Sequence, residues 1–436
     1  MLPKIMATTF KFLQNSTPRE RRALAASTLG WMLDGMDITL YAMVLAELMR
    51  ELNLSKGEAG LLASLTLVAS AAGGILFGFV ADRLGRRFAL MASIVVYSVF
   101  TAACGLSHGL LELAIFRCLL GLGMGGEWGS GAALVAETWR PEYRAKALGI
   151  MQSGYAIGYA LAALINWLIL RRFGWRAVFF AGLLPALLTL WIQRRVEESP
   201  LWLAREQGLG TRDSGLGKET PPARILNPES RILPTADGSL FSKRHLPNVL
   251  ITLLMNSAAL FGWWGLFTWI PPYLALPAAQ GGKGLSVAAS SLWIVVMQVG
   301  MWIGYVSFGF ISDALGRKRT YAGYLLLAAV LVPFYAGAGS PAMLLVLGPL
   351  LAFFGTGHFT GFGIIASELF PTSFRGLAMG LTYNFGRAIS AAAPWAIGFL
   401  AARFGFGSAF WLSGAAFLIA GLLSIGLPET RAKALE

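Results

Sequence analysis

Long apolar segments alternate with short polar ones along the whole chain. Twelve apolar segments are each long enough to cross the roughly 30 Å hydrocarbon core of a bilayer as an α-helix. Their approximate residue ranges are 24–46, 58–81, 88–106, 110–136, 145–169, 176–193, 247–274, 286–311, 321–338, 341–366, 376–402 and 408–427. The pattern predicts an all-α integral membrane protein with twelve transmembrane helices.

The polar segments repeat between the two halves of the chain. The sequence GFVADRLGRRFAL at residues 78–90 returns as GFISDALGRKRTY at residues 309–321, which is a shift of 231 positions. The same shift relates Glu137 to Glu368 and Glu198 to Glu429. Parallel repeats of this kind are typical of transporters that move two halves around a central site. The twelve helices are therefore predicted to form two six-helix pseudo-repeats.

One long polar segment separates the two copies. Residues 194–246 are rich in Gly, Pro, Ser and charged residues, and they contain no apolar run of spanning length. Such a composition is typical of a linker. We therefore expect an N-terminal bundle at 1–193, a cytoplasmic linker at 194–246 and a C-terminal bundle at 247–436.

The composition excludes a soluble protein and orients the chain. Hydrophobic residues make up 56% of the chain, charged residues 13%, and the mean hydropathy is +0.63, which is far from the soluble average. Most of the 35 Lys and Arg residues fall in loops on the side of the termini, so both termini are predicted to be cytoplasmic. The net charge of +13 is spread over separate loops, which indicates anionic lipid headgroups and not nucleic acid as the partner. Cys104 and Cys118 indicate neither a disulfide framework nor a metal site.

Acidic side chains within the first span are candidates for carrying protons. Asp34 and Asp37 lie three residues apart, and Asp34 is about 15 Å from the cytoplasmic end at roughly 1.5 Å per residue. Ionisable groups at that depth usually face a cavity or a partner. Two close, buried carboxylates disfavour full ionisation, so at least one is a candidate for reversible protonation. The alternative is a fixed salt bridge with Arg117 or Arg387.

A cation in the eleventh span is the candidate anchor for an anionic substrate. Arg387 lies at a similar depth, three residues after Asn384, and a guanidinium can donate two parallel hydrogen bonds to a carboxylate. The alternative is an internal salt bridge with one of the two aspartates. Glu127 and His358 are related by the same shift of 231 positions, so we expect them at equivalent depths. Each is a candidate titrating group or a structural hydrogen-bonding group. We assign Glu127 to proton coupling, and His358 and Asn384 to substrate binding.

Polar and aromatic residues recur on single faces of three further spans, which favours a solvated cavity. The candidate substrate-binding residues are Gln152, Tyr155 and Tyr159, then Asn256, Trp263 and Trp264, and finally Gln298 and Trp302. Pro271 and Pro272 predict a bend at the end of the seventh span. Trp269 and Tyr273 are interpreted as anchors at the membrane interface.

Charged residues that repeat at the inner helix ends are candidates for a gate. We expect their pairing to close the cytoplasmic side and its loss to open that side. The alternative is that they serve only as topology signals. The set comprises Asp82, Arg86, Glu137, Arg144, Glu198, Asp313, Arg317, Glu368, Arg375 and Glu429.

These residues together resemble a known family. The chain resembles the major facilitator superfamily over its whole length, through a loop motif (Gly78, Asp82, Gly85, Arg86, Arg87), a fourth-span motif (Arg117, Gly121, Gly123) and the segments at 198–200 and 428–431. Within it, DGMD at 34–37 and GLGMGGEWGSGAALVAETW at 121–139 resemble proton-coupled importers of aromatic acids, sialic acids and lactate. The resemblance implies a role for Arg117 in proton transfer and a monomeric protein.

The sequence therefore predicts a secondary transporter of a bacterial inner membrane. We expect it to import a small organic acid, namely a monocarboxylate, an aromatic acid or a sialic acid, together with protons by alternating access. No phosphate-binding Gly-Lys-Ser/Thr loop is present, so neither ATP nor a cofactor is expected, and the coupling ion is the proton. An enzyme is not expected. The alternatives are a proton-driven exporter of drugs or metabolites, a sugar porter, or a membrane sensor, which would require a signalling domain.

Overall fold

A computed structural model describes residues 16–200, 202–203, 242, 245–370 and 375–430. The side chains of residues 141, 142, 145 and 375–377 are outside that description. Most of the predicted linker at 194–246 therefore lies outside the described residues, as does the side chain of the gate candidate Arg375.

All regular structure in the described part of the chain is helical. The first half contains α2 (Pro18–Glu51), α3 (Lys56–Leu84), α4 (Arg86–Cys104), α5 (Leu110–Thr138), α6 (Pro141–Phe180), the short 3-10 helix η1 (Ala181–Leu183) and α7 (Leu184–Arg195). The second half contains α9 (Leu246–Phe267), α10 (Ile270–Ala275), η3 (Ala278–Gln280), α11 (Val287–Leu315), α12 (Arg317–Ala336), α13 (Pro341–Thr356), α14 (His358–Leu369), α15 (Arg375–Ser390) and α16 (Ala392–Ile425).

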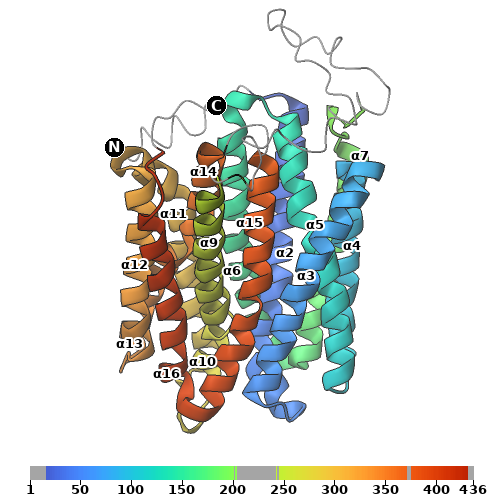
Figure 1. The fold of residues 1–436 in the computed structure, drawn as a ribbon. Coiled ribbons are helices and arrows are strands. Elements are labelled where there is room, and N and C mark those ends of the chain that lie inside the picture. Colours follow the sequence, from blue (N-terminus) through green and yellow to red (C-terminus); the bar gives the residue numbers. More distant parts are fainter. Residues whose placement is uncertain (1–15, 201, 204–241, 243–244, 371–374, 431–436) are drawn as a thin grey trace, which may run out of the picture.

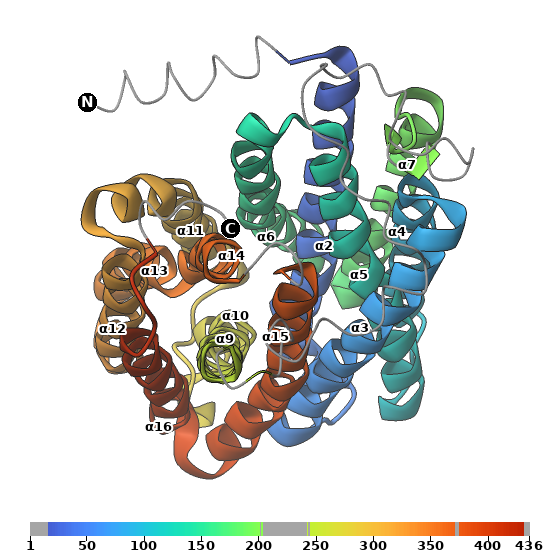
Figure 2. The ribbon, with the colours of Figure 1, turned by 45° about the horizontal axis from the view of Figure 1, so that its top comes forward.

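The helices run roughly parallel to one axis and connect two ends of the molecule (Figure 1). Helix α2 begins and α16 ends at the same end, which we call the termini end, and the opposite end is the distal end. Figure 2 shows α2 to α7 gathered on one side and α9 to α16 on the other. The halves meet where α6 packs against α11 and α3 packs against α15 and α16.

The helices account for the twelve predicted spans. Nine described helical stretches are long and apolar enough to cross a membrane. Two of them, Lys146–Arg195 and Ala378–Ile425, each hold two spans, because the backbone turns at Gly174 (φ 76°) and Gly405 (φ 79°). Positive φ values favour glycine, which has no Cβ. Helix α5 completes the set, so the predicted fold class is confirmed.

Local sequence explains several helix ends. Thr17 with Glu20 and Ser55 with Glu58 form capping boxes at the starts of α2 and α3, which satisfy free N–H groups. The predicted bend is confirmed, since α9 ends at Phe267 and α10 begins at Ile270 before the two prolines.

The interpretation of Trp269 and Tyr273 as interfacial anchors is wrong. Both side chains are buried. Trp269 donates a hydrogen bond to the carbonyl oxygen of Pro394, and Tyr273 donates one to that of Ala336. The polar atoms of these two side chains thus connect the α10 segment to neighbouring helices of the second half.

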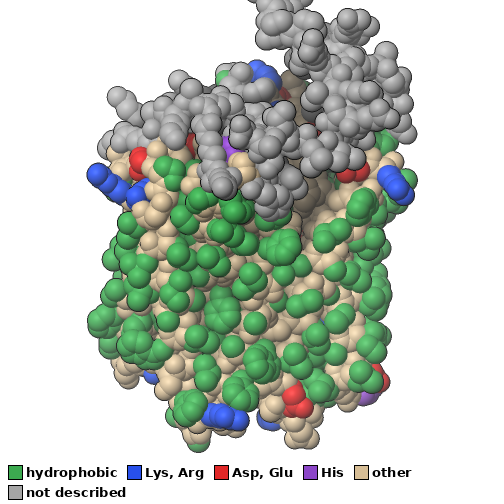
Figure 3. Space-filling view, viewed as in Figure 1, with side chains coloured by type: hydrophobic (Ala, Val, Ile, Leu, Met, Phe, Trp, Pro, Cys, Tyr) green, Lys and Arg blue, Asp and Glu red, His purple; other side chains and the backbone are tan. Residues whose placement is uncertain are grey.

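The outer surface matches a lipid environment. Apolar side chains cover the side face between the two ends, and the charged side chains visible on this face lie at the ends (Figure 3). Large apolar residues on the surface include Ile75, Phe79 and Leu111. A continuous apolar face of this kind is stable in hydrocarbon and not in water.

Candidate functional site

Three carboxylates are buried in the first half, near the middle of the bundle. Asp34 and Asp37 belong to α2 and Glu127 to α5, and each side chain is at most 1% exposed. Oδ1 of Asp34 and both carboxylate oxygens of Asp37 and of Glu127 have no hydrogen-bond partner among the described residues. Buried charge without a partner is costly, so these groups are the first candidates for proton binding or ligand contact.

Asp34 and Glu127 are brought together by a glycine. Gly30 lies one helical turn before Asp34, and a Cβ built on Gly30 would be 2.5 Å from Oε1 of Glu127. The missing side chain therefore lets the α5 carboxylate lie directly against α2. The electrostatic interaction between Asp34 and Glu127 agrees with this arrangement.

Asp37 faces a different group of helices. Its carboxylate faces the Thr101 hydroxyl of α4, and Oδ1 would be 3.2 Å from a Cβ built on Gly182 of η1. Although the two aspartates are close in sequence, Asp37 therefore points into the packing of the first half. Its proposed part in proton coupling stays a prediction.

Arg387 on α15 is the cation that the second half presents to this cluster. Its charge acts on Asp34 and on the hydroxyls of Tyr155 and Tyr383. It is 6% exposed, and it makes no ion pair with a carboxylate of the described residues within 4.0 Å. The fixed salt bridge considered as an alternative is thus absent among the described residues in this conformation, and Arg387 interacts with Asp34 through its charge without direct contact.

Aromatic and amide side chains connect the two halves around this centre. Trp128 donates a hydrogen bond to Oε1 of Gln152 at 3.2 Å and stacks on Tyr383 across the boundary at 5.1 Å between ring centroids. Tyr155 contacts Trp263 of the second half at 5.6 Å. Sequence reasoning missed Trp128 and Tyr383, although each is adjacent to a chosen residue, Glu127 or Asn384.

The other predicted binding residues are distributed unevenly. Tyr159 donates a hydrogen bond across the boundary to the carbonyl oxygen of Phe267 at 2.8 Å. Asn256 donates one to the carbonyl oxygen of Thr382 at 3.2 Å within its own half. Asn384 is exposed and bonds the carbonyl oxygen of Gly380. Gln298 is buried, and its side-chain amide has no partner among the described residues.

His358 and Trp302 lie away from this centre. His358 is buried and stacks on Phe359 at 4.3 Å, with Tyr321 and Phe417 at its edges, so its ring contacts are all in the second half. Trp302 is 41% exposed and shares its helix face with the exposed Val299 and Val306. The prediction that Trp302 lines the cavity is therefore not supported by its position, because that face of α11 points outward.

Arg117 is buried toward the distal end, apart from the acids. Its guanidinium lies 3.7 Å from the centre of the Tyr41 ring, and Nε donates to the carbonyl oxygen of Leu62 at 3.3 Å. Nη1 has no partner, and no carboxylate among the described residues forms an ion pair with it. It lines an enclosed pocket together with Thr39, Tyr155, Tyr159, Trp263 and Trp264.

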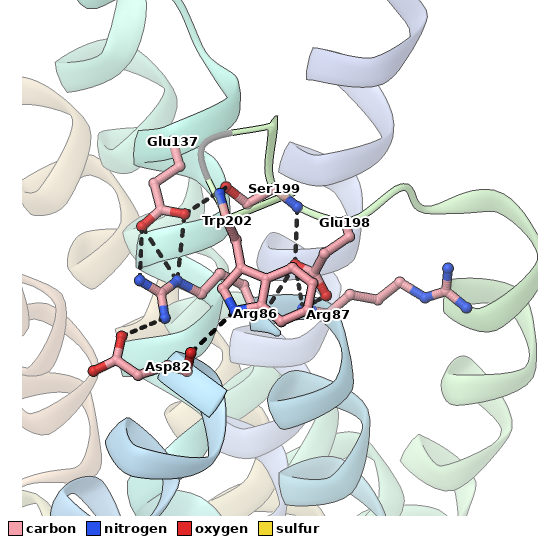
Figure 4. A network of polar contacts seen from close by, with 7 residues as sticks. All are labelled: Asp82, Arg86, Arg87, Glu137, Glu198, Ser199 and Trp202. Carbon is pink, nitrogen blue, oxygen red and sulfur yellow. Dashed lines mark hydrogen bonds and ion pairs between the residues drawn. The ribbon is translucent and has the colours of Figure 1, made fainter. Parts of the chain in front are cut away.

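A charged network occupies the termini end of the first half (Figure 4). Arg86 pairs with Asp82 at 2.6 Å and with Glu137 at 3.1 Å. Glu198 accepts hydrogen bonds from the backbone N–H groups of Arg86 and Arg87 at the start of α4. Ser199 donates to Glu137 at 2.5 Å. A carboxylate at a helix N-terminus is electrostatically favourable.

The second half repeats this network residue for residue. Arg317 pairs with Asp313 and, at 3.1 Å, with Glu368. Glu429 accepts from the N–H of Arg317 at 2.8 Å, and Thr430 donates to Glu368 at 2.7 Å. We call the two networks the termini-end clusters.

These ion pairs join helices within one half and do not cross between the halves. Nε of Arg144 is buried without a hydrogen-bond partner among the described residues. The predicted gate role of the clusters stays a prediction.

No group of three His, Cys, Asp or Glu residues in the described ranges is arranged to hold a metal ion. The site is instead a set of unpaired carboxylates facing an arginine across an aromatic boundary. Such a site can bind a proton and an organic anion.

Comparison with known proteins places the chain in a family. The model of the Major Facilitator Superfamily matches residues 27–279 and 273–436. The cis,cis-muconate transport protein of Acinetobacter baylyi is 31% identical, with 91% of each chain covered. The sialic acid transporter NanX of Escherichia coli is 29% identical, with 94% of each covered. The inward-open xylose transporter XylE of Escherichia coli has a TM-score of 0.73 at 22% identity, covering 94% of this chain and 97% of that one. The chain therefore belongs to the Major Facilitator Superfamily of membrane transporters.

Proposed function

We propose that this transporter imports a small organic acid together with one or more protons by alternating access. The observation that carries the proposal is Arg387 of the second half, which faces Asp34 of the first half with no ion pair between them. The similarity to muconate and sialic acid transporters supports an organic acid as the substrate. We further propose a monomer in a bacterial inner membrane.

The pairing of one cation with two acids explains how protons and substrate would be coupled. An ionised Asp34 competes with a substrate carboxylate for Arg387, because both are anions that a guanidinium binds well. When the cluster of Asp34 and Glu127 holds a proton, Arg387 is free to bind the substrate. Release of both to the cytoplasm then restores the starting charge.

The contacts between the halves support alternating access. Among the described residues, the hydrogen bonds between the halves lie in the distal half. They run from Tyr159 to Phe267, from Asn166 to Ser291, from the backbone N–H of Trp395 to Ser64, and from Lys56 to Gln280 and Ala401. The distal half is thus where hydrogen bonds hold the two halves together in this conformation, as expected for a transporter whose distal end is closed. The excess of Lys and Arg at the termini end supports its assignment to the cytoplasm.

The test is uptake into proteoliposomes. Radiolabelled muconate, benzoate, a sialic acid and xylose are offered with and without an inward proton gradient. We expect gradient-driven accumulation of one of the acids and none of xylose. Asp34→Asn should abolish accumulation against a gradient but keep exchange of labelled for unlabelled acid, because the substrate anchor remains. Arg387→Gln should abolish both.

The matched control is Glu112→Gln, an exposed acid at the distal end, which should behave like the unchanged protein. Uptake of xylose in place of any acid would move the assignment to a sugar porter. Gradient-driven accumulation that persists in Asp34→Asn would remove Asp34 from the proton path.

A further inference from the structure

The pocket beside Arg117 lies between the halves and on the distal side of the acids. Its α2 residues, Ile38 to Ala42, follow Asp34 by four to eight positions, or about 6–12 Å at roughly 1.5 Å per residue. Trp263 and Trp264 of α9 close it from the second half. A ligand on the way from the distal end to Arg387 would therefore meet this pocket first.

Three hydrogen-bond donors of this pocket are buried and unused. Nη1 of Arg117, the Tyr155 hydroxyl and Nε1 of Trp263 have no partner among the described residues, and each side chain is more than nine-tenths buried. Other polar groups of the lining are satisfied, since the hydroxyls of Tyr41 and Tyr159 both donate to backbone carbonyl oxygens. An unmade hydrogen bond is costly in the interior, so the three donors together indicate a missing acceptor.

The chemistry of the lining selects the kind of acceptor. One guanidinium and two neutral donors belong to residues that line the pocket, and that lining contains no carboxylate. This set complements an anion with two oxygens, as a carboxylate has. The walls are the rings of Tyr155, Tyr159, Trp263, Trp264 and Phe267, and stacking between them suits a flat, unsaturated or aromatic acid. The free volume is about 20 Å³ in this conformation, which is room for about one water molecule, so an acid would bind only after the two halves move apart here.

We propose that the Arg117 pocket is a second carboxylate-binding position, separate from Arg387, for planar organic acids. The inference rests on the proposed function and names its substrate class. Tyr155 connects the two positions, because it lines the pocket and also lies within reach of the Arg387 charge. A diacid would occupy both positions with its two ends, whereas a monoacid would occupy them in turn or as two molecules.

Binding to the purified full-length protein in nanodiscs tests the inference. Titration calorimetry with benzoate, muconate and neutral benzamide gives both affinity and stoichiometry. We expect Arg117→Gln to weaken benzoate or muconate at least about 10-fold, the lower range for a hydrogen bond to a charged group. Tyr155→Phe and Trp263→Phe each remove one hydrogen-bond donor but keep an aromatic ring. Each should lower the affinity for the acids about 3- to 10-fold. The affinity for benzamide should change less than about 3-fold in all three variants, because benzamide carries no negative charge.

Tyr324→Phe is the matched control, because its hydroxyl contacts Ser307 in the second half, away from the pocket. The Tyr155 and Trp263 variants keep the test valid even where Arg117→Gln fails to fold. One bound muconate that is weakened by both Arg117→Gln and Arg387→Gln assigns the two positions to one substrate. Two bound benzoates assign them to two molecules.

Acid affinity that is unchanged in all three pocket variants would overturn the inference and leave water as the missing acceptor. Proton-coupled acid uptake by the unchanged protein would then still uphold the proposed function. An unchanged protein that binds no acid at all would instead overturn both.

Discussion

Individual side chains in this transporter owe their roles to the absence of a neighbouring atom. Glu127 can lie against α2 only because residue 30 is glycine. Asp34 and Arg387 face each other without an ion pair, so each stays available to a ligand. At this scale, function depends on which groups lack a partner as much as on which have one.

We predict that Gly30→Ala disrupts the acid cluster. The added Cβ would be 2.5 Å from Oε1 of Glu127, and every other atom lies at 3.5 Å or beyond, so the Glu127 carboxylate must turn away from α2. Because this oxygen is the end of a flexible side chain, the expected result is a loss of gradient-driven accumulation with little change of the melting temperature in detergent. Gly129→Ala is the control, because nothing lies within 4 Å of its added Cβ and alanine favours helix. Equal behaviour of the two variants would contradict the described packing.

The sequence predicted which ionisable residues lie within the membrane, but it did not predict the way in which their side chains face. Hydropathy placed Asp34, Asp37 and Arg387 within the membrane, and the structure buries all three. However, Asp37 faces Thr101 and Trp302 faces outward. The face that a helical position presents depends on how the helix is rotated against its neighbours, and those contacts come from segments far away in the chain.

At the scale of helices, the termini-end clusters fix the start of α4 and α12. Gly85 and Gly316 precede these helices with φ near 100°, and the glutamates 198 and 429 cap them. The shift of 231 positions predicted that the same charged residues recur in both halves, but it predicted neither which of them pair within a half nor that the two glutamates cap helices.

We predict that Glu198→Gln and Glu429→Gln destabilise their own halves by similar amounts. Each removes a negative charge from a helix N-terminus, which contributes about 0.3–1 kcal/mol or somewhat more where partly buried. Thermal melting in detergent should show a decrease for each. Glu197→Gln is the control, because that acid is exposed and pairs only with Arg19 at 3.3 Å, and surface pairs contribute little. A larger effect of the control would show that the caps do not stabilise the helices.

The glycine turns at 174 and 405 should matter in the same way in both halves. Their φ values of 76° and 79°, with ψ values of 175° and 164°, lie in a region that costs alanine about 1–3 kcal/mol, although the space around them is open. Gly174→Ala and Gly405→Ala should therefore each lower the melting temperature without a steric clash. Gly407→Ala, two residues after the second turn and also in open space, should not. Equal melting temperatures for all three variants would show that the backbone at positions 174 and 405 does not require glycine.

At the scale of the whole molecule, the hydrogen bonds between the halves in the distal half make a prediction about motion. The side chains of Asn166 and Ser291 are in contact across the boundary at 3.2 Å. With Cys104 and Cys118 replaced, Asn166→Cys combined with Ser291→Cys should allow cross-linking of the halves by a short bifunctional thiol reagent. We expect uptake to stop after cross-linking and to remain in either single variant. Undiminished uptake by the cross-linked protein would argue against alternating access.

The termini-end clusters have a consequence for the speed of transport. Because the ion pairs of Arg86 and Arg317 stay within one half, a movement of the halves as rigid bodies would leave them intact and would keep them out of the activation barrier. What must separate on the termini side of the middle is the stack of Trp128 on Tyr383. A flat substrate ring that inserts between Trp128 and Tyr383 replaces one stacking contact with another. The substrate would therefore lower the activation barrier to its own release.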